Sequence, residues 1–229
     1  LRAHRRHDSA HKHVAGSAIY TDDIPEPPGT LQVYIALSTR AHAAITKLDV
    51  SAVRSAPGVV AVLTAEDIPG ANDVSPFAGD DPMFADGLVS YVGQSIFAVA
   101  AETIEQARAA AKKAIIGYQD KNPLVTIEEA LAAGALLEPV YTMQRGEADV
   151  ALARAKHRLE GRIEIGGQEH FYLEGQAAFA VPGEDDDVTV HCSTQHPSEI
   201  QHKVAHVLGV ANHAVTVEVR RMGGGFGGK

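Results

Sequence analysis

The stretch "GQSIFAVAAETIEQARAAAKKAIIGYQ", residues Gly93–Gln119, predicts a strand, a helix and a second strand in close succession. Thr103 and Gln106 have the spacing of a capping box at the start of the helix. The apolar side chains of the helix then share one face, as in an amphipathic helix: Ile104, Ala107, Ala111, Ala114 and Ile115. This stretch therefore predicts a domain that mixes helices with strands.

The sequence before this unit predicts further strands. Residues Leu31–Thr39 alternate between apolar and polar side chains, which is typical of a half-buried strand. A turn at Pro57 and Gly58 precedes an apolar run that predicts a buried strand. Residues 69–82 have the Gly, Pro, Asn and Asp content of a loop.

A domain boundary is predicted in the region Pro123–Arg145, which contains Pro and Gly and no long periodic element. Within it, Thr126 and Glu129 form a second capping box, and Gly134 is placed to end the short helix that follows. Beyond the boundary we expect a hairpin over 177–194, a helix from Ser198 as N-cap to Gly209 with Gln201 in the capping-box position, and a strand over 214–221.

Composition and charge exclude several classes of protein. The chain has 229 residues, of which 45% are hydrophobic and 21% charged, and its formal net charge is -9. That charge argues against a nucleic-acid-binding or anionic-membrane-binding surface, because phosphate binding needs a basic face. The single cysteine, Cys192, excludes an internal disulfide and a cysteine-based zinc or iron–sulfur site. No apolar run approaches the roughly 20 residues of a membrane span, so we expect a soluble, cytoplasmic protein.

The stretch "RRMGGGFGGK", residues Arg220–Lys229, fits two phosphate-binding patterns. It contains G-x-G-x-x-G, and it matches G-x-x-x-x-G-K of a P-loop without the following Ser or Thr. It also follows a predicted strand, as both patterns require. Glycines here allow close approach of the backbone to a ligand. The pattern permits a nucleotide without favouring one, and a flexible turn is the alternative.

The stretch "GGQEHFYLE", residues Gly166–Glu174, is a second candidate. If it forms a strand, Gln168, His170, Tyr172 and Glu174 point to one side. A neutral amide such as Gln168 can donate and accept hydrogen bonds, which suits an uncharged or oxo-type ligand atom. The pattern alone favours a strand with one solvated face.

The histidines predict no metal centre. His202 and His206 have metal-ligand spacing on the predicted helix, yet they lie opposite its apolar face, so a solvated face is expected. The histidines of the N-terminal segment favour a polar tail, or a strap on another surface, over a metal site: His4, His7, His11 and His13.

Five stretches together carry a family resemblance: "HDSAHKHVAGSAIYTDDIPEPPG", "YVGQSIFAVAAET", "GGQEHFYLEGQ", "STQHPSEIQH" and "VEVRRMGGGFGGK". They resemble the N-terminal part of the molybdopterin-binding large subunit of bacterial xanthine dehydrogenases, within the xanthine oxidase/aldehyde oxidase family. The resemblance runs from about His7 to Lys229. Related aldehyde oxidases and carbon monoxide dehydrogenases share the general layout.

The resemblance implies a fold class and the boundaries of the domains along the chain. The fold is α+β (α/β), an N-terminal hammerhead domain followed by the start of a molybdenum-cofactor-binding domain. The expected segments are an N-terminal tail over 1–13, the hammerhead domain over 14–122, a linker over 123–145 and an incomplete cofactor-binding domain over 146–229.

The resemblance also implies site residues. Gln168 is expected to hydrogen-bond an oxo ligand of the molybdenum. Phe226 and Gly227, with Gly225, are expected to pack against the metal and the pterin through their backbone. Gln168 and Phe226 would thus lie near the metal without ligating it. No catalytic residue is expected in the chain, because the family's substrate-orienting and general-base glutamates would follow Lys229.

The implied reaction is hydroxylation of xanthine or hypoxanthine with oxygen from water. Electrons would pass to FAD and [2Fe-2S] centres on a partner subunit, and the rest of the large subunit would be a further partner. We expect the 229-residue chain alone to be inactive. The alternatives are a truncated P-loop nucleotide-binding module and a non-catalytic docking domain.

Overall fold

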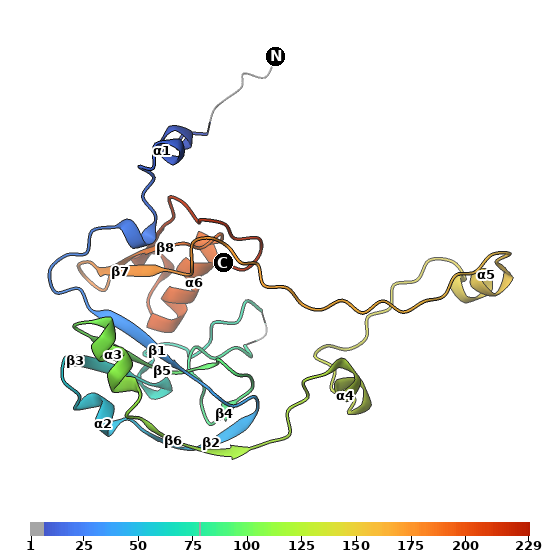
Figure 1. The fold of residues 1–229 in the computed structure, drawn as a ribbon, viewed down its shortest axis with the longest axis horizontal. Helices are drawn as coiled ribbons and strands as arrows, with labels where there is room; N and C mark the ends of the chain where they lie inside the picture. The colour runs from blue at the N-terminus through green and yellow to red at the C-terminus, as the bar shows by residue number, and fades with distance from the viewer. Residues whose placement is uncertain (1–6, 78) are drawn as a thin grey trace. The chain divides into compact units, whose positions relative to one another are not determined.

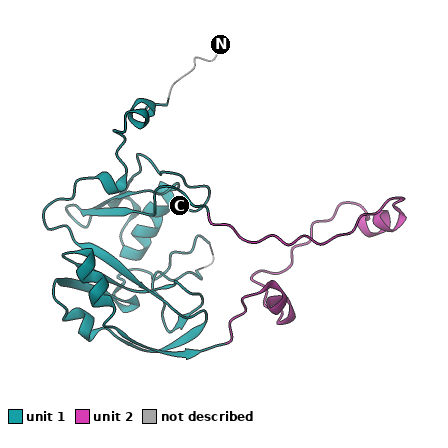
Figure 2. Cartoon of the chain, viewed as in Figure 1, with its two compact units in different colours: residues 1–121, 170–229 teal, residues 122–169 magenta. Residues whose placement is uncertain are grey.

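The computed structural model describes residues 7–77 and 79–229 and shows a mixture of helices and strands, as the sequence predicts (Figure 1). Contacts within the chain divide it into two units (Figure 2). The first unit comprises the chain up to Lys121 together with His170–Lys229, and the second is Asn122–Glu169.

The strand–helix–strand stretch forms β5 (Ser95–Ala101), α3 (Ile104–Ala111) and β6 (Ile115–Asp120), as predicted. β5 is the central strand of a three-stranded antiparallel sheet, between β1 (Gln32–Leu37) and β3 (Val59–Leu63). Because both of its edges are paired and α3 contacts it, β5 is almost entirely buried.

A second antiparallel sheet has β2 (Ala43–Asp49) at its centre, between β4 (Leu88–Val89) and β6. Two short helices, α1 (Ala10–Val14) and η1 (Thr21–Asp23), precede the first strand, whereas α2 (Ser51–Arg54) and η2 (Ala65–Asp67) lie between strands. Residues 69–77 and 79–82 contain no helix or strand, in agreement with the predicted loop.

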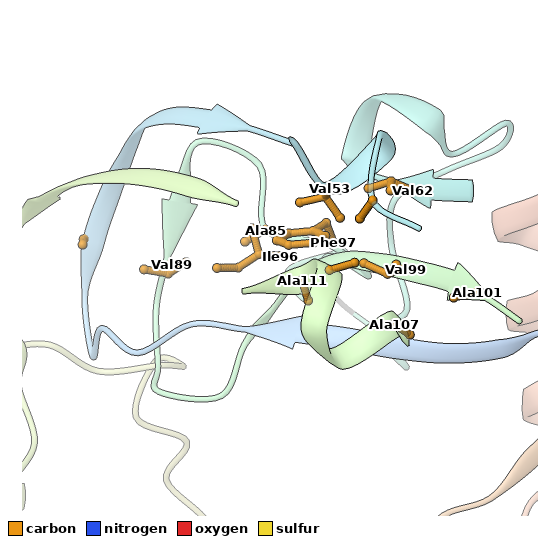
Figure 3. Packing of buried hydrophobic residues seen from close by; sticks show 13 residues of the cluster. Val53, Val62, Ala85, Val89, Ile96, Phe97, Val99, Ala101, Ala107 and Ala111 are labelled. Carbon is orange, nitrogen blue, oxygen red and sulfur yellow. The ribbon is translucent and has the colours of Figure 1, made fainter. Parts of the chain in front are cut away.

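The hydrophobic core of this region centres on β5 (Figure 3). Ile96, Phe97 and Val99 are completely buried, and Ala107 of α3 packs into the same cluster. Each large apolar side chain buried in this way stabilises the fold by about 1.5–3 kcal/mol. The predicted burial of β3 is only partly correct, because Val60 is 60% exposed: β3 is an edge strand with one uncovered face.

The C-terminal part of the first unit forms a third sheet, in the order β7-β8-β9. The predicted hairpin is present as β7 (Ala178–Pro182) and β8 (Val188–Cys192). β9 (Val215–Glu218) is parallel to β8, and α6 (Pro197–Leu208) with η3 (Asn212–Ala214) makes the crossover that parallel strands require. Cys192 is a buried core residue.

The predicted start of α6 is wrong. Its N-cap is His196, whose Nδ1 accepts from the Glu199 N–H at 3.4 Å, and not Ser198. Pro197 occupies the first helical position, where its fixed φ and missing N–H favour a helix start, so the helix begins before Ser198. The predicted end is confirmed, since Gly209 is left-handed at φ 71°.

The second unit contains α4 (Ile127–Ala132) and α5 (Ala148–Arg154), and neither helix buries a side chain. The Thr126–Glu129 capping box at the start of α4 is confirmed, and Gly134 follows the helix in the left-handed conformation. The segment limits 1–13, 14–122, 123–145 and 146–229 stay predictions, and residues 1–6 of the tail, with His4, lie outside the described residues.

Candidate functional site

The glycine loop, Met222–Lys229, follows β9 in the first unit. Gly223, Gly224 and Gly227 have positive φ values of 56°, 101° and 95°, which glycine adopts without steric cost. Phe226 also has a positive φ, 53°, where a side chain is strained. Backbone strain of this kind is characteristic of functional loops.

Two glutamines hold the loop from the side of the third sheet. The Oε1 atom of Gln195 accepts from the Gly227 N–H at 2.9 Å, and the Gln195 N–H donates to the Lys229 carbonyl at 3.2 Å. Gln176 Nε2 donates to the Gly228 carbonyl at 3.0 Å. The C-terminal half of the loop is therefore fixed by side chains that flank β7 and β8.

A buried ion pair holds the loop at its two ends. Lys229 Nζ lies 3.4 Å from Glu174 Oε2, and the two side chains are only 1% and 9% exposed. The same ammonium donates to the Met222 carbonyl at 2.5 Å and lies 4.8 Å from the centroid of the Tyr172 ring. The lysine is thus already engaged inside the protein, which does not favour the P-loop interpretation, in which it would bind a phosphate.

The N-terminal strap, His7–Ile19, is attached to the residue that precedes the loop. Arg221 donates to the Ile19 carbonyl and to the Ser9 hydroxyl, each at 2.9 Å, and Ser9 is buried. An open cavity of about 600 Å³ lies between the strap and the loop. The segment is therefore held by Arg221 at Ser9 and at Ile19, which favours the strap interpretation at these two residues.

The loop is exposed where the cofactor is expected. Phe226 is 76% exposed, and a Cβ atom on Gly227 would have its nearest neighbour, His170 Nε2, at 3.8 Å. By contrast, a Cβ on Gly225 would lie 2.4 Å from Gln195 Oε1. Gly225 thus packs against the protein's own side chains, whereas Phe226 and Gly227 are open to a ligand. An anchored loop with an open backbone tip fits a large planar cofactor such as a metallo-pterin.

Gln168 belongs to the second unit, whereas the glycine loop belongs to the first. Gln168 is exposed and lies outside helices and strands. The strand predicted over Gly166–Glu174 is wrong: Phe171 has φ 50°, which breaks the alternation of a strand, and none of these residues is in regular structure. Within the first unit, the structure places Gly225, Phe226 and Gly227 together on the glycine loop, and the role of Gln168 stays a prediction.

Several residues that hold the loop were not identified as such from the sequence: Tyr172, Glu174, Gln176, Gln195 and Lys229. Glu174 and Tyr172 were only placed with Gln168 on a polar strand face.

Outside the loop, His202 and His206 are exposed, as predicted for a solvated helix face. Within the described residues, no group of three or more His, Cys, Asp or Glu side chains could hold a metal ion. No helix among them has both the length and the apolar character of a membrane span.

Two family models match consecutive parts of the chain. The family model described as "Aldehyde oxidase and xanthine dehydrogenase, a/b hammerhead domain" matches residues 15–122. The model described as "Molybdopterin cofactor-binding domain" matches residues 133–229. The chain is 42% identical to the xanthine dehydrogenase/oxidase of Gallus gallus over 97% of its own length and 16% of that protein.

The chain is similarly related to aldehyde oxidases. Aldehyde oxidase 1 of Bos taurus is 45% identical over 97% of this chain and 17% of its own length. The aldehyde oxidoreductase of Desulfovibrio gigas superposes with a TM-score of 0.85 at 27% identity, over 96% of this chain and 26% of that one. The chain thus spans about one sixth of the length of the curated relatives named here. It belongs to the aldehyde oxidase and xanthine dehydrogenase family, with sequence that matches the hammerhead and molybdopterin cofactor-binding domains.

Proposed function

We propose that this chain supplies part of the cofactor-binding region of a molybdenum hydroxylase that oxidises xanthine or hypoxanthine. The observation that carries the proposal is the glycine loop, which is anchored by Gln195 and Lys229 and leaves Phe226 and Gly227 exposed. The match to a molybdopterin cofactor-binding domain over residues 133–229 supports it. When bound, the molybdenum centre would supply the oxidation of a purine carbon with oxygen from water.

The chain's own residues would position the cofactor. The exposed backbone of Phe226 and Gly227 would pack against the pterin and the metal, and the left-handed Phe226 sets the direction of its side chain. The Gln168 amide would hydrogen-bond an oxo ligand of the metal, since an amide N–H₂ can donate to it without adding charge. Gln176 and Gln195 would keep the loop from moving when the cofactor binds.

The remaining redox centres would be FAD and [2Fe-2S] clusters on a partner subunit of a cytoplasmic enzyme. A [2Fe-2S] cluster takes four cysteine thiolates, and this chain has one cysteine, which is buried in the third sheet. The other partners would be the rest of the same subunit and the purine substrate. By resemblance, the substrate-orienting and general-base glutamates are outside this chain, so we propose that the chain alone does not turn over xanthine.

The test uses the complete protein with its redox partners. Molybdenum and pterin content should be close to one per subunit, and kcat/KM should be higher for xanthine and hypoxanthine than for an aromatic aldehyde. Absence of molybdenum would contradict the whole proposal. A loaded enzyme that prefers the aldehyde would contradict the purine assignment.

A variant tests the role of Gln168. Gln168→Leu should lower kcat/KM for xanthine by roughly 10- to 100-fold, as loss of an outer-sphere partner of a metal does. Gln144→Leu is the matched control, since it changes another exposed glutamine of the second unit. Equal activities for the two variants would show that Gln168 has no role at the metal. Molybdenum analysis and a xanthine assay on the isolated 229-residue chain test its inactivity.

A further inference from the structure

The carboxylate of Glu174 lies at the point where three segments of the first unit meet. We propose that Glu174 is a positioning residue: through Lys229 it fixes the conformation in which the glycine loop presents Phe226 and Gly227 to the cofactor. The inference rests on the proposed function for its purpose, but its structural part concerns this chain alone.

Both carboxylate oxygens of Glu174 and its backbone N–H contact neighbouring segments. Oε2 pairs with Lys229 Nζ at 3.4 Å, and Oε1 accepts from the Thr21 N–H at 3.3 Å. The Glu174 N–H donates to the Gly223 carbonyl at 3.4 Å. The residue therefore ties the start of the glycine loop, its end and the segment that follows the N-terminal strap to one another.

Lys229 links the Glu174 carboxylate to both ends of the glycine loop. Its ammonium reaches back to the Met222 carbonyl, so the first and last residues of the glycine loop are joined through one cation. The Tyr172 ring lies under the same cation at 4.8 Å, in the range of a cation–π interaction. Loop closure of this kind restricts the backbone between the two ends, where Phe226 and Gly227 lie.

Burial makes this pair different from the surface ion pairs of the chain. Glu128 and Arg162 are closer, at 2.9 Å, but their side chains are 70% and 77% exposed. Exposed pairs of this kind contribute little, whereas removal of one partner of a buried pair leaves an uncompensated charge. The Glu174–Lys229 pair is thus expected to control local structure, and the Glu128–Arg162 pair is not.

Steric contact reinforces the electrostatic one. A Cβ atom on Gly223 would lie 2.1 Å from the Glu174 Cβ, and Gly223 is itself left-handed. The loop backbone therefore packs directly on Glu174 at the place where the chain turns. At the other end of the loop, the Gly227 N–H is held by Gln195 and the Gly228 N–H by the Gly225 carbonyl at 2.8 Å.

The test compares Glu174→Gln with Glu128→Gln in the complete protein. Hydrogen exchange of the Gly227 and Gly228 amides is measured first, on cofactor-free protein. Glu174→Gln should speed their exchange roughly tenfold or more relative to the amides of β5, because local opening and not global unfolding exposes them. Glu128→Gln should change neither set. Equal acceleration at β5 and at the loop, or no acceleration, would overturn the proposal.

Cofactor retention is the second measurement. Molybdenum and pterin content per subunit should fall roughly tenfold in Glu174→Gln, as for outer-sphere residues of metal sites, and stay unchanged in Glu128→Gln. Full retention in Glu174→Gln would also overturn the proposal. If Glu174→Gln does not fold, the double variant Glu174→Gln/Lys229→Met, which buries no lone charge, replaces it and must show the same local exchange.

The two measurements separate this inference from the proposed function. If the wild-type protein binds no molybdenum cofactor, the proposed function fails. The exchange data then still show whether Glu174 orders the loop. If the wild-type protein is loaded but Glu174→Gln behaves like wild type in both measurements, the proposed function stands and the positioning role of Glu174 is wrong.

Discussion

The backbone N–H of Gly70 donates to the carbonyl oxygen of Val207 at 2.9 Å, and the next N–H, that of Ala71, donates to the His206 carbonyl at 3.1 Å. Both carbonyls are in the last turn of α6, where helix carbonyls have few partners within the helix; the His206 carbonyl also accepts from the Gly209 N–H at 3.3 Å. A loop far away in sequence therefore caps the helix that leads to β9 and the glycine loop. The approach is possible because residue 70 has no side chain.

Gly70→Ala should destabilise the first unit. A Cβ there would lie 2.2 Å from the His206 carbonyl oxygen and 2.6 Å from the Gly209 nitrogen, which are backbone atoms that cannot turn aside. We expect a loss of about 1–3 kcal/mol in the free energy of unfolding, measured by urea denaturation. Gly161→Ala is the control, since a Cβ there meets nothing within 4 Å; it should change stability by less than about 1 kcal/mol. Equal effects would contradict the role of Gly70.

The capping boxes of α3 and α4 should differ in their importance. In each, a threonine Oγ1 accepts from the N–H three residues later at 3.2 Å: Gln106 for Thr103 and Glu129 for Thr126. Thr103→Ala should cost about 1 kcal/mol, because α3 packs three buried alanines against the core. Thr126→Ala should leave the unfolding of the first unit within about 0.5 kcal/mol of wild type, because α4 buries nothing. Urea denaturation followed by circular dichroism measures both variants. A larger loss of unfolding free energy in Thr126→Ala than in Thr103→Ala would contradict this prediction.

The parts of the fold that could be predicted from the sequence are those that residues close to one another in the chain determine. The order β5, α3 and β6 follows from hydrophobic periodicity and from the Thr103 cap, and the β7–β8 hairpin follows from two apolar runs around a polar turn. The exceptions have local causes of their own. His196 replaced Ser198 as N-cap because Pro197 starts the helix, and the left-handed Phe171 removed the strand expected at 166–174.

The candidate site could be predicted only in part, for a different reason. The family resemblance identified the glycine loop, but its anchors are far from it in sequence: 55 residues separate Glu174 from Lys229, and 32 separate Gln195 from Gly227. No periodic pattern links such residues, because the contacts exist only after β7, β8 and β9 have formed one sheet. The sequence around a single glutamate or glutamine does not indicate which distant segment its side chain will contact in the fold.

Acid should remove a stabilising contact at Asp67. The Thr64 N–H and hydroxyl both donate to its Oδ2 at 2.8 Å, and with Arg54 nearby they hold the pKa of Asp67 below its ordinary value of 3.8. The stabilisation is therefore fully present above that value and is lost as the pH falls through the lowered pKa of the folded state. Asp67→Asn cannot titrate, so between pH 5 and pH 2 wild type should lose more stability than this variant.

Urea denaturation at a series of pH values measures the difference. Asp185→Asn is the matched control, since it removes one negative charge from an exposed hairpin turn and should keep the pH dependence of wild type. If Asp67→Asn and wild type lose stability in parallel on acidification, the Thr64 contacts do not stabilise the folded carboxylate.

Phe226 should show opposite effects on stability and on cofactor binding. Its φ of 53° costs a residue with a side chain about 1–2 kcal/mol, and at 76% exposure the ring buries little apolar surface. Glycine removes the strain but adds backbone entropy to the unfolded chain, about 0.5–1 kcal/mol. Phe226→Gly should therefore keep the free energy of unfolding or raise it by up to about 1 kcal/mol. If the left-handed backbone at Phe226 packs at the metal as proposed, the more flexible glycine should lower molybdenum content and xanthine turnover at the same time.

Asp186→Gly separates the two effects. Asp186 is also left-handed, at φ 68°, but lies in the exposed turn between β7 and β8. Relief of strain there should raise stability by a similar amount while molybdenum content and xanthine turnover stay unchanged. A loss of stability in Phe226→Gly would mean that the ring packs against the protein and not against a ligand. Full cofactor content in Phe226→Gly would mean that the strain at this position serves another purpose than holding the metal centre.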